Sequence, residues 1–270
     1  MEIAEQAIHL LAKMATEVQA RFTGFSDLAH GWEHVHRVYH LALYLAEQEH
    51  ADGLIVGMAA LLHDLGRTTR GPMHSHAERS AQLSKELLAS YDLPYETQHA
   101  ILHAILSHSY RHGVEPATLE ARVLYDADRL DSLGASGVMR WAMTAKHGRW
   151  PEIKTYHPDD PFALWRVPDG QRYLLDRFFT KLLKLQEVMT TATGRAMAER
   201  RMAFLRLYLQ ELQQELTEGG YGYDMPAEVT YRLPRDEKRA EEQKKEQPAE
   251  DLQGGRDVAI HRIYDEQQSA

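Results

Sequence analysis

Apolar residues recur mainly at three- and four-residue steps along the first 145 positions, where glycine and proline are sparse. This spacing is the period of a helix that buries one face. No two segments alternate as paired strands do. The pattern predicts an all-α protein. Its helices are expected near residues 2–20, 32–50, 52–65, 75–91, 94–109, 117–130 and 135–147.

Residues 148–171 hold four prolines and two tryptophans, which break any helix and predict a long loop or flap. Two further helices are predicted after it, at 172–190 and 195–217. Each places a row of apolar side chains on one face, as a packed amphipathic helix does. The rows are Leu174, Phe178, Leu182, Leu185 and Met189, and then Ala198, Met202, Leu205, Leu209, Leu212 and Leu216.

The composition changes after Pro234 to a mixed-charge stretch that is nearly free of apolar residues. Such a segment is typical of a flexible tail or an exposed helix. We therefore expect one folded domain over residues 1–220, followed by a charged C-terminal extension over 221–270.

Charge and residue usage exclude several classes of protein. The net charge of −9 disfavours a protein that wraps a nucleic-acid duplex. No run of eighteen apolar residues is present, and the acidic, amphipathic N-terminus does not resemble a signal peptide, so we expect a cytoplasmic protein. With no cysteine and sixteen histidines, any metal must be bound through nitrogen and oxygen.

Adjacent His63 and Asp64 end the apolar helical run AALLHDLG at 59–66. Such a pair is costly to bury without a partner, and a metal ion would serve both. His34 shares a helical face with apolar residues at i+4, i+7 and i+11, so it should point inward, whereas His36 and His40 lie on another face and should be solvated.

A further inward acid, Asp128, lies in RVLYDADRLDSLGASG at 122–137. With His34, His63 and Asp64 it completes two imidazoles and two carboxylates from three helices. This donor set suits Mn²⁺, Fe²⁺, Co²⁺, Ni²⁺ or Zn²⁺ and can leave positions for water and a phosphate oxygen.

These segments resemble the HD-domain superfamily of metal-dependent phosphohydrolases, in its stand-alone bacterial branch. The resemblance is carried, in order, by GWEHVHRV, LLHDLGR, SHS at 107–109, DADRLD and FFTKLLKLQEVMTTATGRAMAERRMAFL, and it covers about residues 20–217. It implies an HD-domain helical bundle with additional C-terminal helices.

The resemblance also implies roles for single residues. His34, His63, Asp64 and Asp128 match the four metal ligands of the superfamily, and Asp64 matches the aspartate that bridges two ions in binuclear members. The residues that match the histidines supplied for a second ion are His76 and His108. Alternatively, His76 and His108 are histidines of the core that bind no metal. His103 is a weaker candidate, because its five-residue offset from His108 places the two side chains on different faces of a helix.

A phosphate substrate needs positive groups beyond the ion, and the candidates are Arg67, Arg129 and Lys181. Lys181 lies near an apolar face. Instead of binding phosphate, it could extend along that face and place its ammonium group in water. No acid follows the HD pair until Glu78, so Glu78 or a protonated His108 would have to serve as general acid.

The leading hypothesis is hydrolysis of a phosphoester or phosphoanhydride in a nucleotide-like small molecule by metal-activated water. The resemblance implies nucleoside triphosphate pyrophosphohydrolysis as one such activity. Flap aromatics could cover a base or merely anchor the loop; they are Trp150, Tyr156, Phe162 and Trp165. The alternatives are a di-iron oxygenase and a regulatory domain that binds a metal or nucleotide without turnover. One ion is required and a second is optional; the oligomeric state, including a homodimer, is open.

Overall fold

A computed structural model describes residues 2–69, 75–109, 113–147 and 152–220. The described residues form helices and no strand, apart from one isolated bridge between Lys154 and Tyr173, so the all-α prediction is confirmed. The elements are α1 (Glu2–Arg21), α2 (Trp32–Glu49), α3 (Gly53–Leu62), η1 (Leu65–Arg67), α4 (His76–Leu88), α5 (Tyr95–Ser107), α6 (Leu119–Leu130), α7 (Gly134–His147), α8 (Asp176–Thr180), η3 (Leu182–Val188) and α9 (Ala192–Glu218).

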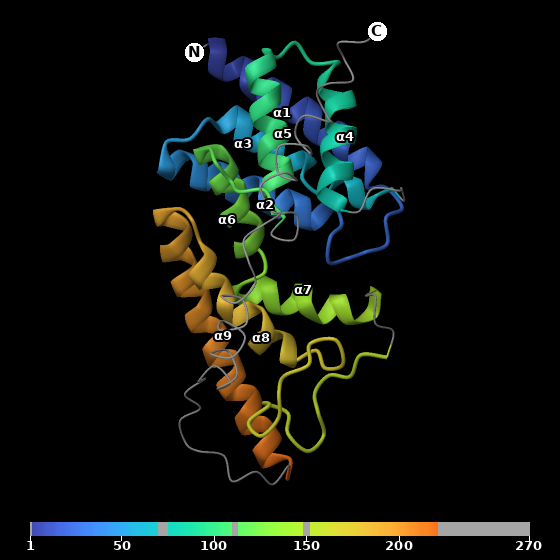
Figure 1. Cartoon of the computed structure of the whole chain (residues 1–270), viewed down its shortest axis with the longest axis vertical. Coiled ribbons are helices and arrows are strands. Elements are labelled where there is room, and N and C mark those ends of the chain that lie inside the picture. Colours follow the sequence, from blue (N-terminus) through green and yellow to red (C-terminus); the bar gives the residue numbers. More distant parts are fainter. Residues whose placement is uncertain (1, 70–74, 110–112, 148–151, 221–270) are drawn as a thin grey trace, which may run out of the picture.

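The first six helices gather at one end of the molecule, and α7, α8 and α9 lie at the other (Figure 1). Helix α3 contacts α1, α2, α5 and α6, and each residue from Val56 to Leu62 is buried. A helix that is apolar on every side must be surrounded by other helices. Asp52 begins it by accepting hydrogen bonds from the backbone N–H groups of Leu54 and Ile55.

Gly66 lets the chain after α3 pass close to α4. A Cβ at this position would lie 2.5 Å from the His76 carbonyl oxygen and 2.5 Å from the Ser80 nitrogen, both of them backbone atoms. The Gly66 N–H donates to Ser80 Oγ, and Arg79 Nε donates to the Gly66 carbonyl. These bonds fasten η1, and with it the preceding His63 and Asp64, to the start of α4.

The prediction of one helix over 172–190 is wrong. The chain forms the five-residue α8 and the 3₁₀ helix η3, and Lys181 between them leaves helical geometry at φ −138° and ψ −58°. The buried Asp176 at the start of α8 accepts hydrogen bonds from Arg166 and from the Asp169 N–H, which ties this segment to the preceding loop. The apolar row is nevertheless buried from Phe178 onward.

Helix α9 confirms the second C-terminal prediction, and its predicted face packs against the core. Its start is held by the buried Asp126 of α6, which accepts hydrogen bonds from the backbone N–H groups of Thr190 and Thr191 and from both of their hydroxyls. Gly194 leaves room for that carboxylate, because a Cβ there would lie 2.2 Å from Asp126 Oδ2.

The loop between α7 and α8 contains three aromatic residues of the predicted flap within its described part. Phe162 is buried and Tyr156 packs against the core, so these two anchor the loop, whereas Trp165 is 79% exposed. Trp150 and the predicted extension 221–270 lie outside the described residues. Within the described residues, no helix is both long and apolar enough to cross a membrane.

Gly66→Ala is expected to lower the free energy of unfolding by about 1–3 kcal/mol, because its methyl group meets backbone atoms of α4 that cannot rotate away. The matched control is Gly53→Ala at the start of α3, where nothing lies within 4 Å of the added Cβ. Urea unfolding of both variants measures the difference. Equal stabilities would show that η1 and α4 are not tightly joined.

Candidate metal centre

Six side chains from five segments converge at the ends of the central helices. His34 comes from α2, His63 directly follows α3, and Asp64 comes next in the chain. The remaining three are His76 at the start of α4, His108 directly after α5, and Asp128 of α6. Their ligand atoms form two groups, each compact enough to surround one ion: His34, His63 and Asp128, and Asp64, His76 and His108.

The first group is almost fully buried. His34 Nε2 lies 3.3 Å from His63 Nε2 and 3.4 Å from Asp128 Oδ1. Both imidazoles have no exposed surface, and the Asp128 side chain is 24% exposed. The inward orientation predicted for His34 is therefore confirmed, and Asp128 forms the side of the group that solvent can reach.

The second group is built from the histidines that follow the HD pair. His76 Nε2 lies 3.2 Å from His108 Nε2, and these two nitrogens lie 3.5 Å and 3.9 Å from Asp64 Oδ1. His108 is buried, whereas the His76 side chain is 21% exposed. The geometry thus brings together both histidines predicted for a second ion.

Asp64 lies between the two groups and faces each with a different oxygen. Its Oδ2 lies 3.6 Å from His34 Nε2 and 3.7 Å from His63 Nε2, while Oδ1 faces the second group. Arg67 Nε approaches Oδ1 to 2.6 Å, yet neither atom has a hydrogen-bond partner among the described residues. A buried carboxylate oxygen without a hydrogen-bond donor is a position that a metal ion would satisfy.

The ring tautomers strengthen the fit to a metal. His63 Nδ1 lies 2.7 Å from the Ala60 carbonyl and His108 Nδ1 lies 2.5 Å from the Ile105 carbonyl, so we assign the ring proton to Nδ1 in both. His34 Nδ1 likewise donates to the Asp131 carboxylate at 2.8 Å. Each of these rings therefore turns an Nε2 lone pair toward the centre, where facing lone pairs repel unless a cation lies between them.

Burial favours the neutral form of His63, His76 and His108. It lowers the pKa of His63, lowers that of His76 to about 3 and lowers that of His108 to about 4. Burial would raise the pKa of Asp64, but favourable interactions, the largest of them with the Arg67 guanidinium, hold the pKa well below its usual value. Neutral imidazoles beside ionised carboxylates are the protonation states that bind a divalent metal.

The sequence alone missed the role of Asp131, which lies just after α6 and is buried. Its carboxylate accepts hydrogen bonds from His34 Nδ1 and, in a bidentate arrangement, from Arg37 Nε and Nη2 at 2.8 and 3.1 Å. A carboxylate behind a ligating histidine fixes the ring and raises its basicity. The spacing could have identified Asp131, because an acid three residues after Asp128 lies on the same side of a helix.

Three other predicted site residues have structural partners. Arg129 donates through Nη1 to the carbonyls of His108 and Tyr125, and Glu78 accepts a hydrogen bond from the Ser75 N–H in the capping box of α4. Lys181 is exposed and places Nζ 4.9 Å from the centre of the Trp141 ring. Their roles toward a substrate remain predictions, as does that of Arg67.

The other candidate histidines lie outside the two groups. His103 accepts a hydrogen bond from the Ala117 N–H at 3.2 Å. His36 and His40 are exposed on α2 and contact each other, as predicted.

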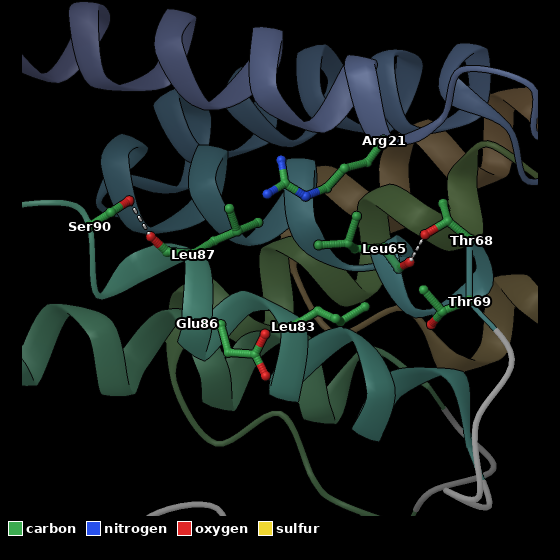
Figure 2. A pocket seen from close by; sticks show the side chains of 8 residues that line it. All are labelled: Arg21, Leu65, Thr68, Thr69, Leu83, Glu86, Leu87 and Ser90. Atoms are coloured by element: carbon green, nitrogen blue, oxygen red, sulfur yellow. Dashed lines mark hydrogen bonds between the residues drawn. The ribbon is translucent and has the colours of Figure 1, made fainter.

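A pocket of about 420 Å³ lies between the end of α1, the chain after Asp64, and α4 (Figure 2). Its lining combines one arginine and one glutamate with leucines and hydroxyl groups; the residues are Arg21, Leu65, Thr68, Thr69, Leu83, Glu86, Leu87 and Ser90. The hydroxyls of Thr68 and Ser90 donate to the carbonyls of Leu65 and Leu87. None of these eight residues is one of the six candidate ligands.

The fold and the donor set define an all-helical protein with a candidate centre for divalent transition metals. The HD domain family model matches residues 31–133, which include all six candidate ligands. The uncharacterized protein YpgQ of Bacillus subtilis is 31% identical over 211 residues, which cover 76% of this chain and 92% of YpgQ. The chain therefore belongs to the HD-domain family, whose members bind divalent metals.

Solved structures agree with this assignment. The structure of B. subtilis YpgQ in complex with ADP is 30% identical, has a TM-score of 0.61, and is matched over 77% of this chain and 96% of that one. An HD-superfamily hydrolase of Bacillus thuringiensis is 27% identical with a TM-score of 0.58, over 78% of this chain and 98% of that one. The fold is thus that of the HD-superfamily hydrolases.

Asp131→Asn is expected to weaken metal binding by about 10- to 100-fold, because it removes the charge that orients His34 and raises its basicity. The control is Asp92→Asn at an exposed position. Competition with a chromogenic chelator for Mn²⁺ measures both affinities. An unchanged affinity in the Asp131 variant would refute the role given to this carboxylate.

The metal-free protein is expected to lose stability as the pH falls below about 6.5. Burial lowers the histidine pKa values, so the unfolded chain binds protons that the folded chain rejects, and His76 alone, with its pKa of about 3, accounts for roughly 2 kcal/mol between pH 7 and 5. The lowered pKa of Asp64 acts in the same direction below about pH 4.

Urea unfolding after chelation, at pH 7 and pH 5, measures this dependence. His76→Gln should flatten it, whereas the exposed His9→Gln should not. Equal slopes for all three proteins would contradict the assignment of a neutral, partly buried His76.

Proposed function

We propose that this protein is a metal-dependent phosphohydrolase that acts on a nucleotide-like small molecule. The observation that carries the proposal is the pair of ligand groups that share Asp64, with neutral imidazoles facing ionised carboxylates. Two ions at such groups would supply an activated water molecule and neutralise charge on a phosphoryl group. One ion at the first group is the minimum that the proposal requires.

The residues of the chain have separate tasks in this proposal. His34, His63 and Asp128 would hold one ion, His76 and His108 a second, and Asp64 both. The Arg67 side chain is 27% exposed beside Asp64, so its guanidinium can bind a phosphoryl oxygen at the edge of the centre. Glu78 and Lys181 stay as candidate general acid and candidate phosphate-binding residue.

The substrate class rests on a relative. YpgQ was solved in complex with ADP, and hydrolysis of a phosphoester or phosphoanhydride, including release of pyrophosphate from a nucleoside triphosphate, matches the proposed centre. Trp165 is an exposed aromatic side chain in the loop before α8 and offers a surface on which a base can stack.

A di-iron oxygenase is the second candidate, because His76 and His108 do meet at Asp64 as a second ion would require. Iron content after aerobic purification separates the two reactions. Two irons per chain without phosphate or pyrophosphate release would favour the oxygenase. Nucleotide binding without any turnover would favour a regulatory domain.

The test is a panel of nucleotides and phosphomonoesters with Mn²⁺, Co²⁺, Ni²⁺ and Mg²⁺, in which phosphate and pyrophosphate are detected separately. The double variant His63→Ala, Asp64→Ala should lose metal binding and at least 100-fold in hydrolysis, because it removes a ligand of the first group and the shared carboxylate. His103→Ala is the matched control, since His103 is a partly buried histidine outside both groups.

Hydrolysis that survives the double variant would overturn the proposal. The proposal would also be overturned if the wild-type protein, with metal bound, cleaved no compound in the panel.

A further inference from the structure

Arg140 of α7 reaches the candidate metal centre, although no pattern in the sequence pointed to α7 as part of it. Its side chain is 9% exposed, and all three guanidinium nitrogens have partners. Nε donates to the Ala29 carbonyl at 2.6 Å, Nη1 donates to Ser132 Oγ at 3.0 Å, and Nη2 lies 3.3 Å from His34 Nε2. Two nitrogens thus fix the guanidinium, and the third is directed at a ligand atom.

The contact with His34 is available only when that ring binds no metal. His34 Nδ1 donates its proton to Asp131, so Nε2 holds the single lone pair of the ring. A metal ion at Nε2 would take this lone pair. Arg140 would then keep its anchors at Ala29 and Ser132, while Nη2 would carry a proton with no acceptor on His34.

A buried guanidinium N–H that loses its acceptor needs another one. Arginine stays protonated and is well suited to phosphate oxygens, which accept charge-assisted hydrogen bonds. Nη2 lies 3.3 Å from His34 Nε2, which in turn lies 3.4 Å from Oδ1 of the partly exposed Asp128. A phosphoryl oxygen of a substrate that approaches over Asp128 would therefore come close to Nη2.

We infer that Arg140 is a substrate-binding residue that holds a phosphoryl oxygen beside the metal centre, and that metal binding at His34 releases its Nη2 for this purpose. The inference rests on the proposed function and deepens it. It assigns the phosphate contact at the first ligand group to Arg140, complementing Arg67 on the Asp64 Oδ1 side. It also predicts an order of binding in which the metal precedes the phosphate.

The experiment measures binding of inorganic phosphate and of ADP by calorimetry, with and without saturating Mn²⁺, and Mn²⁺ affinity separately. Arg140→Met should weaken both anions by about 10- to 100-fold at saturating Mn²⁺, since it removes a charge-assisted hydrogen bond. Mn²⁺ affinity should not fall, because the variant removes a contact with His34 Nε2 that the metal must displace. Without metal, the wild-type protein should bind phosphate at least 10-fold more weakly than with it.

Two controls separate binding from general charge and structure. Arg206→Met on the exposed side of α9 removes the same charge and should leave both affinities unchanged. Like Arg140, whose Nη1 lies 3.6 Å from Asp131 Oδ2, Arg37 contacts Asp131, but it binds the carboxylate that accepts from His34 Nδ1. Arg37→Met should therefore change Mn²⁺ affinity more than phosphate affinity at saturating metal.

Ser132→Ala keeps Arg140 and removes one of its anchors, so it should weaken phosphate binding by a few-fold with unchanged Mn²⁺ affinity. This variant decides the matter if Arg140→Met does not fold. Phosphate affinity unchanged in the folded Arg140 variant, or unchanged in Ser132→Ala when the other does not fold, would overturn the inference. An equal loss in Arg206→Met would overturn it as well.

The two proposals fail in different ways. If the wild-type protein binds phosphate through Arg140 but cleaves no compound of the panel, the hydrolase proposal fails and the binding role stands. If it hydrolyses a nucleotide while Arg140→Met binds phosphate as tightly as the wild type, the binding role fails and the hydrolase proposal stands.

Discussion

One buried carboxylate, that of Asp64, lies between two groups of histidines, and the surrounding structure serves to keep it there. Its two oxygens face different groups, and Oδ1 has no hydrogen-bond partner among the described residues. An ionised carboxylate in such a position is stable only beside compensating positive charge. Arg67 supplies part of it, and a metal ion at the converging Nε2 atoms would supply the rest.

The helices around this carboxylate are joined by polar contacts as well as by apolar packing. Gly66 and Ser80 fasten the chain after Asp64 to α4, and Asp131 fixes the ring of His34. Farther from the centre, Asp126 of α6 holds the start of α9. Because α6 carries Asp126 and Asp128 and is followed by Asp131, one short helix connects the metal centre with the C-terminal helices.

Much of the fold and the six side chains that meet in the candidate metal centre could be predicted from the sequence. Helical periodicity found α1–α7 and α9, because each buries one face or, in α3, every face. The helix expected over 172–190 was wrong because apolar spacing does not distinguish an α-helix from a 3₁₀ helix, and the chain leaves helical geometry at Lys181. Lys181 itself was singled out by its apolar neighbours, and the structure places its ammonium over Trp141.

An all-α fold, nitrogen and oxygen donors and the order of the candidate ligands all follow from the sequence, since the HD pair, His34 and Asp128 lie in local patterns that a helix must present inward. The packing of the helices shows which candidate ligands lie close enough to surround one ion, that Asp64 faces both groups, and that Asp131 and Arg140 contact the two ring nitrogens of His34. Such contacts join residues about a hundred positions apart. Helical spacing carries no information at that range, because the packing of separate helices fixes these distances.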